Sequence, residues 1–265
     1  MNSDRKVQRV DAHGDTAVVV PAKDEELRVA ATVRAAQSIP GVDLVIVVDD
    51  GSVDGTTYAA ERAGATVLRH PRNRGKAAAM ESGAAAVRAA DARECRPQPR
   101  HLLFLDADLE GTAASAAALV PPVRAGAADM TIAVLPPQAR KGGGRGFVVK
   151  LSRRGIARAT GFAAAQPLSG QRCLSRAAFE AARPLAYGFG VETALTIDLL
   201  KAGLKVREVE CELHHRVTGS DWRSQVHRAR QYVHVARALG VRRLRPQTRP
   251  AEGAAAGKGG VTTPL

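Results

Sequence analysis

The chain has 265 residues, of which 45% are hydrophobic and 25% charged, as is typical of a folded globular protein and not of a disordered one. Its apolar runs are too short to span a bilayer and its first fifteen residues lack the apolar segment of a signal peptide, so we expect a cytoplasmic protein. Three scattered cysteines, Cys95, Cys173 and Cys211, match neither a zinc site nor a disulfide framework. The net charge of +13 favours an anionic partner, whereas an aromatic content of 3% argues against nucleic acid.

Residues 15–135 alternate short apolar runs with segments of helical spacing. This alternation predicts an α/β protein with a Rossmann-like, mainly parallel sheet and helices on both faces. The predicted strands are Thr16–Val20, Leu44–Val48, Thr66–Leu68, Leu102–Leu105 and Asp129–Val134. The predicted helices are Asp24–Ser38, a segment ending near Arg62, Lys76–Ala90 and Thr112–Arg124.

The second half of the chain, residues 136–245, has a different pattern and predicts an α+β extension. Pro136–Gly146 is basic and rich in glycine, which predicts a mobile loop. The elements predicted after it are helices at Phe147–Thr160, Ala177–Ala182, Val191–Ala202 and Asp221–Leu239, and a strand at Lys205–Glu210. We expect one domain over residues 15–245, between a flexible stretch 1–14 and a disordered tail 246–265.

Unusual polar residues follow four of the predicted strands. They form the segments Pro21–Glu26, Asp49–Thr56, Asn73–Lys76 and Asp106–Asp108. Any one of them, taken alone, is explained by a turn or a helix cap. Ligands of open parallel sheets bind beyond the carboxyl ends of the strands, so four such segments at one edge predict a binding site.

Asp106 and Asp108 are the most informative pair. Two carboxylates, two residues apart where a buried strand ends, repel each other unless a cation lies nearby, and such oxygen ligands select Mg²⁺ or Mn²⁺. A metal-bound diphosphate would explain an acidic pocket in a basic protein, and Asp49 and Asp50 could accept hydrogen bonds from a ribose or a base. A solvated acidic loop is the alternative.

The segments Val18–Glu26, Val47–Thr56 and Leu105–Asp108 resemble, in order and spacing, the signatures of family-2-type glycosyltransferases with the GT-A fold. The resemblance covers about residues 15–240. It implies a UDP- or GDP-linked sugar donor and a divalent metal, with residues 15–135 as the donor half and residues 136–245 as the acceptor half.

Within that fold, the second half resembles the glucosyl-3-phosphoglycerate synthases. The similar segments are the Pro167–Gly170 turn, the helix start Gly188–Glu192 and the pair His215-Arg216. Two departures argue for a different acceptor: no threonine follows Gly144-Arg145-Gly146, and Gln171-Arg172 stands where that family has an acidic residue. A phosphorylated metabolite and a polyprenyl phosphate both stay open as acceptors.

Together the two resemblances imply a set of site residues. For donor binding they are Pro21, Ala22, Glu25, Asp50, Gly75, Lys76, Asp106 and Gly170. The metal ligands are Asp108 and His215, and the residues assigned to catalysis are Glu192, Asp108 and Lys76. For the anionic acceptor we predict Arg145, Arg172 and Glu192, since arginine suits bidentate phosphate recognition. Arginines that only solvate helix faces are the alternative.

The last predicted helix allows two interpretations. Trp222, Val226, Ala229, Val233 and Ala236 fall on one face of it. Packing of this face on the sheet is the simpler interpretation. Docking on the inner face of an anionic membrane, helped by Arg242, Arg243 and Arg245, is the other. A homodimer, a non-catalytic sugar-nucleotide-binding protein and a nucleotidyltransferase also stay open.

Overall fold

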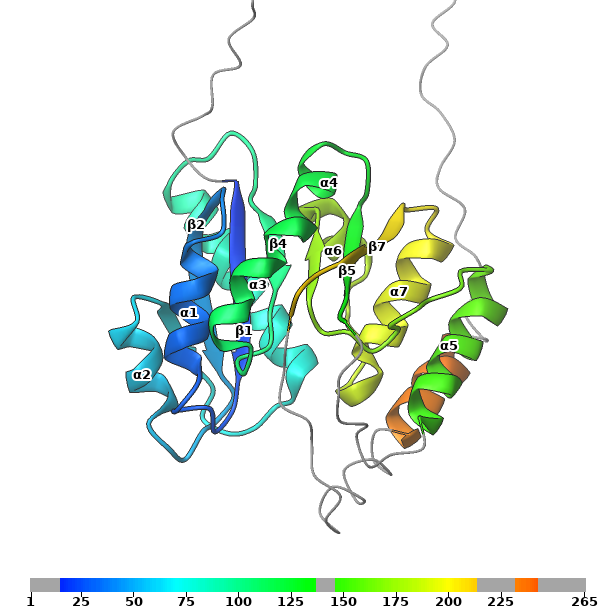
Figure 1. The fold of residues 1–265 in the computed structure, drawn as a ribbon, viewed down its shortest axis with the longest axis horizontal. Helices are drawn as coiled ribbons and strands as arrows, with labels where there is room; N and C mark the ends of the chain where they lie inside the picture. Colours follow the sequence, from blue (N-terminus) through cyan, green and yellow to red (C-terminus); the bar gives the residue numbers. More distant parts are fainter. Residues whose placement is uncertain (1–14, 137–145, 214–231, 243–265) are drawn as a thin grey trace, which may run out of the picture.

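The structure is a computed structural model that describes residues 15–136, 146–213 and 232–242. Seven strands form one sheet in the order β3-β2-β1-β4-β6-β5-β7, with the strands roughly vertical in Figure 1. All neighbouring pairs are parallel except those of β6, which runs antiparallel to both β4 and β5. The strands are β1 (Thr16–Ala22), β2 (Val42–Asp49), β3 (Thr66–Arg69), β4 (His101–Phe104), β5 (Met130–Val134), β6 (Arg172–Leu174) and β7 (Val206–Glu210).

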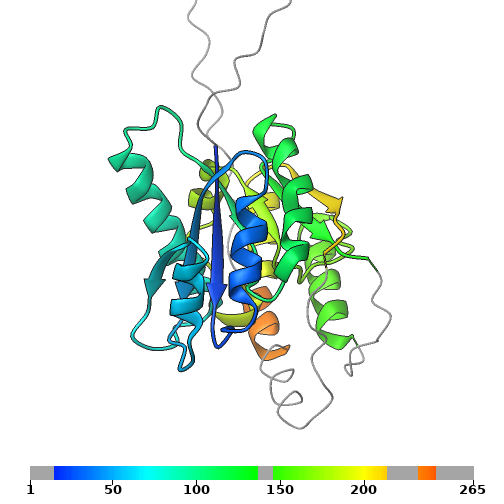
Figure 2. The ribbon, with the colours of Figure 1, turned by 60° about the vertical axis from the view of Figure 1, so that its left-hand side comes forward.

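Helices cover both faces of the sheet, as Figure 2 shows from the side. The α-helices are α1 (Val29–Gln37), α2 (Thr56–Arg62), α3 (Lys76–Arg93), α4 (Val120–Arg124), α5 (Phe147–Thr160), α6 (Arg176–Ala181) and α7 (Val191–Lys201). Two 3₁₀ helices, η1 (Glu110–Leu119) and η2 (Gly188–Gly190), precede α4 and α7. The mixed α/β fold predicted from the sequence is therefore confirmed.

Alternate residues of the central strands enter two separate cores. On β1, Val18 and Val20 pack with α1, α2, η1 and α4, whereas Ala17 and Val19 pack with α3, α6 and α7. This division follows from the two-residue period of a strand. A third, smaller core joins α5, α7 and the helical residues 232–242 through Ile156, Ile197 and Leu239.

Several predicted boundaries are wrong. Helix α1 begins at Val29 and not at Asp24, because residues 24–28 form a turn in which Asp24 has a left-handed φ of 56°. The segment 110–119 is a 3₁₀ helix, and the α-helix begins only at Val120, with prolines in its first turn, where their missing N–H groups cost nothing. The last helix continues through Gly240 to residue 242. Strand β6 was not predicted.

The face that this last helix buries also differs from the prediction. Val235, Ala238 and Leu239 are buried, whereas Val233 is 60% exposed. Arg242, which the alternative interpretation placed at a membrane surface, is buried and forms an ion pair with Asp198. None of the described helices has the length and apolar character needed to cross a membrane.

Candidate functional site

The turn after β1 is bound to the loop after β2. The Asp24 N–H donates to Ser52 Oγ at 2.9 Å, the Asp24 carboxylate accepts from the Val53 N–H at 2.9 Å, and the Glu25 N–H donates to Thr56 Oγ1 at 2.8 Å. An aspartate suits this position because Asn and Asp tolerate left-handed backbone. The predicted donor-binding residues Pro21, Ala22 and Glu25 therefore lie at the carboxyl edge of the sheet, although the Glu25 carboxylate already accepts a hydrogen bond from Arg28 at 2.7 Å.

Asp50 lies one residue beyond β2 and is 5% exposed. Its carboxylate accepts hydrogen bonds from the backbone N–H groups of Arg74 at 2.8 Å and Gly75 at 2.7 Å, and its Oδ1 lies 2.7 Å from His70 Nδ1. These contacts hold the loop that leads into α3. Predicted as a base or ribose contact, Asp50 is in this structure the anchor of the neighbouring loop.

Asp49, at the end of β2, is 1% exposed and also holds residues that follow it in place. It accepts a hydrogen bond from the Ser52 N–H at 2.8 Å and another from the Thr57 hydroxyl. Burial acts to raise the pKa of Asp49, but the hydrogen bonds from Ser52 and Thr57 and the charge of Arg69 outweigh it, and the pKa is lowered. Asp49 is therefore ionised at neutral pH and is committed to structure.

Residues from three separate segments meet at Lys76, the first residue of α3. Its ammonium lies 2.7 Å from Asp106 Oδ1 and 3.1 Å from Glu192 Oε1. Glu192, in the first turn of α7, is 8% exposed. Burial acts to lower the pKa of Lys76, but the charges of Asp106 and Glu192 outweigh it and raise the pKa above its usual value, so Lys76 is a permanent cation.

Two further residues complete this cluster. A Cβ atom at Gly170 would lie 2.4 Å from Lys76 Nζ and 2.8 Å from Asp106 Oδ2, so only glycine fits there without displacing the charged groups. Gln171, 2% exposed, donates from Nε2 to Asp106 Oδ2 at 2.7 Å and accepts from Ser169 Oγ at 3.1 Å. The structure thus brings together four predicted residues, Lys76, Asp106, Gly170 and Glu192, and adds Gln171.

Gln171 was missed as a site residue. Its position depends on β6, since the Ala133 N–H of β5 donates to the Gln171 carbonyl at 3.0 Å and places its side chain beside Asp106. The sequence signal was the polar pair Gln171-Arg172, interpreted as part of a turn and not as the start of a strand.

Asp108 differs from the other acids of this edge because its carboxylate is partly exposed and no described residue donates a hydrogen bond or forms an ion pair with it. A free carboxylate beside Asp106 fits a hard divalent cation. Residues 15–136, 146–213 and 232–242 contain no group of three or more metal-ligating side chains. The other predicted metal ligand, His215, lies outside the described residues, as does the acceptor residue Arg145.

Arg172 was predicted to bind the acceptor, and this is wrong for the described structure. Its side chain is 0% exposed, and it donates from Nε to the Ser169 carbonyl at 2.8 Å, from Nη1 to Thr196 Oγ1 at 2.8 Å and from Nη2 to the Pro167 carbonyl at 3.1 Å. Burial lowers the pKa of Arg172 to about 10. The guanidinium therefore holds the 167–170 turn against α7, and the side chain is closed off from solvent.

Comparison with known proteins identifies relatives of this chain. Residues 17–147 match the family model described as glycosyl transferase family 2. Residues 17–147 belong to this family. It is also 32% identical over 185 residues to the glycosyltransferase AglJ of Haloferax volcanii, an alignment that covers 67% of this chain and 56% of AglJ. The chain thus spans about half the length of this curated relative.

Solved structures of the GT-A fold are similar to this chain. Glucosyl-3-phosphoglycerate synthase from Mycobacterium tuberculosis, in complex with Mn²⁺, UDP and glucosyl-3-phosphoglycerate, is 26% identical with a TM-score of 0.69, and the match covers 91% of this chain and 82% of that one. The complex of that enzyme with Mn²⁺, UDP-glucose and glycerol 3-phosphate has a TM-score of 0.66, 26% identity and coverages of 91% and 83%.

Proposed function

We propose that this chain is a metal-dependent glycosyltransferase that moves a sugar from a UDP- or GDP-linked donor to an anionic acceptor. One observation carries the proposal: Lys76, Asp106, Gly170 and Glu192 converge at the carboxyl edge of the sheet, beside the uncommitted carboxylate of Asp108. The similar synthase has been crystallised with a divalent ion and UDP, which supports the same class of donor here.

The chemistry of these residues fits the reaction. Transfer breaks the bond between the anomeric carbon and the diphosphate, forms a bond to an acceptor oxygen, and leaves extra negative charge on the diphosphate. A Mg²⁺ or Mn²⁺ held by Asp108 would supply Lewis-acid stabilisation of that charge. Lys76, whose pKa is raised by its two acidic neighbours, would supply further electrostatic stabilisation, and Asp106 is the residue that we assign to the ribose of the donor.

Glu192 is the residue we assign to both the sugar and the acceptor. It is nearly buried, it holds Lys76 at 3.1 Å, and it stands at the start of α7, where the helix dipole favours a negative charge. The acceptor itself we propose to carry a phosphate or a carboxylate, as phosphoglycerate and glycerol 3-phosphate do in complexes of the similar synthase.

The experiment is a transfer assay with Mn²⁺, a panel of UDP- and GDP-sugars, and three acceptor types: 3-phosphoglycerate, a polyprenyl phosphate and a neutral sugar. Nucleoside diphosphate should be released, faster with an anionic acceptor than with the neutral one. Chelation of the metal should stop the release.

Two outcomes would support the alternatives. Tight donor binding with neither hydrolysis nor transfer would indicate a sugar-nucleotide-binding protein. Formation of a nucleoside-diphosphate sugar from a nucleoside triphosphate and a sugar phosphate would indicate a nucleotidyltransferase. Equal use of the neutral sugar would refute the anionic acceptor alone and leave the donor chemistry intact.

A further inference from the structure

Helix α5 carries a row of cations that form no ion pair with any acid of the described residues. Lys150, Arg154 and Arg158 are spaced by four residues, so they lie along one face of the helix, and all three are exposed. The helix contains no Asp or Glu, and within the described part of the chain none of the three forms an ion pair. A fourth cation, Arg153, is different because it donates to the carbonyls of Ala164 and Ala165.

Exposed apolar side chains lie beside this row. The helical segment 232–242 packs along α5, and between them is a hollow of about 350 Å³ whose walls include Phe147, Leu151 and Tyr232 together with the three cations. Phe147 is 60% exposed and Tyr232 is 46% exposed. The whole chain has only nine aromatic residues, five Phe, three Tyr and one Trp, so two on one hollow is a concentration.

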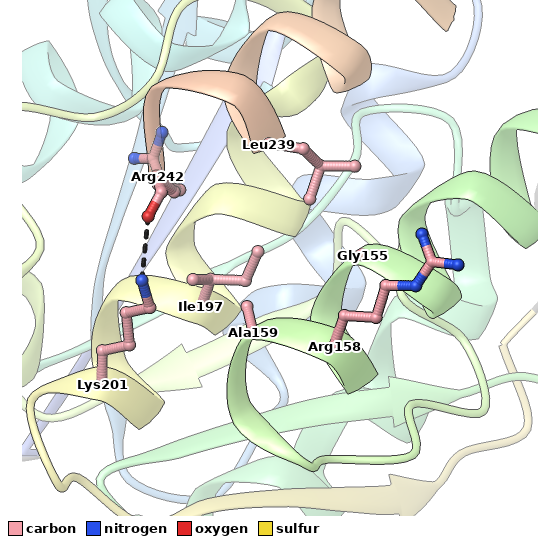
Figure 3. Close-up of a pocket in the computed structure, with 7 residues that line it drawn as sticks. All are labelled: Gly155, Arg158, Ala159, Ile197, Lys201, Leu239 and Arg242. Carbon is pink, nitrogen blue, oxygen red and sulfur yellow. Dashed lines mark hydrogen bonds between the residues drawn. The ribbon is translucent and has the colours of Figure 1, made fainter. Parts of the chain in front are cut away.

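A second hollow, of about 250 Å³, continues this groove toward α7. Figure 3 shows Arg158 on one side of it and Lys201 on the other, with Ile197 and Ala159 between them. The two hollows share Gly155, where a Cβ atom would lie 2.3 Å from Leu239 Cδ2. The missing side chain therefore allows the two helices to approach closely and leaves the groove at their surface.

We infer that this groove, with the cation row Lys150, Arg154 and Arg158, binds the surface of a bilayer that contains anionic lipids. Cations next to half-exposed aromatic and aliphatic side chains match the boundary between charged headgroups and acyl chains. A second copy of this chain fits less well, because it would bring another cation row, and +13 of net charge, to the same place. A purely polar polyanion would leave Phe147, Tyr232 and the neighbouring Val233, itself 60% exposed, without a role.

The groove lies on the same side of the molecule as the Lys76–Asp106–Glu192 cluster. Ser152 of α5 and Thr193 of α7 share a hydrogen bond of 2.6 Å, and Thr193 directly follows Glu192. In Figure 1, the amino end of α5 and the segment 232–242 lie at the lower end of the molecule, where β1 also ends. Docking through this groove would hold the Lys76–Asp106–Glu192 cluster close to the lipid surface.

The test is sedimentation of the full chain with vesicles of phosphatidylcholine, with and without phosphatidylglycerol, and it does not depend on transfer activity. The wild type should sediment only with the anionic vesicles, and added salt should release it. The triple variant Lys150→Glu/Arg154→Glu/Arg158→Glu should bind at least about 100-fold more weakly, since each basic residue near an anionic surface strengthens binding about fivefold. The pair Phe147→Ser/Tyr232→Ser should weaken binding about tenfold.

The matched control is Arg34→Glu/Arg62→Glu/Lys205→Glu, which changes the net charge equally at exposed cations of α1, of α2 and of the residue just before β7. It should stay within about threefold of the wild type, because distant charges are screened. Equal loss in both triple variants, or wild-type binding by the α5 variant, would overturn the inference. So would absence of vesicle binding in a chain that binds duplex DNA through the same three residues.

Discussion

Replacing Asp50 tests whether this carboxylate anchors a loop or only contacts the donor. In the Asp50→Ala variant, the N–H groups of Arg74 and Gly75 and the ring of His70 lose their acceptor. His70 is 4% exposed and cannot recover its hydrogen bond from water, whereas the two N–H groups lie in a loop with partial access to solvent. The loop should then loosen in front of Lys76, which begins α3 directly after Gly75.

The expected cost follows from these three contacts. A hydrogen bond to a charged group contributes about 1.5–3 kcal/mol, and an unsatisfied buried donor costs about as much. Counting the His70 contact at about 2 kcal/mol and each partly solvated N–H at about 0.5–1 kcal/mol gives a loss of about 3–4 kcal/mol in the free energy of unfolding. For a domain of this size, that corresponds to a fall in Tm of roughly 10 °C.

Thermal unfolding at neutral pH, without ligand, measures this effect. Asp50→Asn is the matched variant, because it keeps one acceptor oxygen and should lose about half as much stability. Binding of UDP with Mn²⁺, measured by calorimetry well below each Tm, should be weakened in both variants because Lys76 is no longer fixed. An Asp50→Ala protein that melts within about 1 °C of the wild type yet loses UDP would show that Asp50 is a ligand contact and that this reasoning is wrong.

Three other substitutions separate further roles. Asp108→Asn should change the free energy of unfolding without ligand by less than about 1 kcal/mol, since no described residue donates to this carboxylate. The same variant should lose the Mn²⁺-dependent rise in Tm that UDP gives to the wild type. A full rise would contradict the assignment of Asp108 as a metal ligand. Gln171→Leu removes the donor to Asp106 Oδ2, so it should lower the free energy of unfolding by about 1–3 kcal/mol and weaken the binding of UDP. An unchanged affinity for UDP in calorimetry would limit the role of Gln171 to packing. The pKa of Asp49 is lowered on folding, so its contribution to stability is complete above its unfolded pKa of about 3.9 and is lost as the pH falls through the folded value. Urea unfolding from neutral to acid pH should therefore show a smaller acid loss in Asp49→Asn than in the wild type, and parallel curves would argue against this origin of acid sensitivity.

The carboxyl edge of the sheet could be predicted from the sequence because it depends on strand order and polarity alone. Parallel strands end at one edge, so Lys76 and Asp106, thirty residues apart, were both expected at that edge, and the structure adds that their charged groups lie 2.7 Å apart. The placement of Gly170 and Glu192 beside them came from the resemblance to known families. Nothing in the spacing of the second half indicates that the chain returns to this edge.

What could not be predicted depends on β6. This strand has only three residues and runs antiparallel between β4 and β5, so it lacks both the length and the periodicity that make a strand visible in a sequence. Its insertion buries Arg172 and aims Gln171 at Asp106. Because an arginine after a glycine-containing turn is usually exposed, the sequence favoured a ligand contact, and tertiary packing reversed this expectation.

The arginines of the second half show why net charge is a poor guide to an acceptor. Arg172 donates its hydrogen bonds to backbone carbonyls, and Arg242 forms an ion pair with Asp198, so neither side chain is available to bind a substrate. Among the described basic residues of the second half that form no ion pair, Lys150, Arg154 and Arg158 of the α5 row lie together on one hollow, next to exposed aromatic side chains. A row of cations along a helix attracts anions over an extended surface, whereas the recognition of a single phosphate requires several cations directed at one point. The excess of positive charge in this chain is therefore better evidence for the inferred contact with an anionic membrane than for the chemistry of the acceptor. The transfer assay is the experiment that identifies the molecule that receives the sugar.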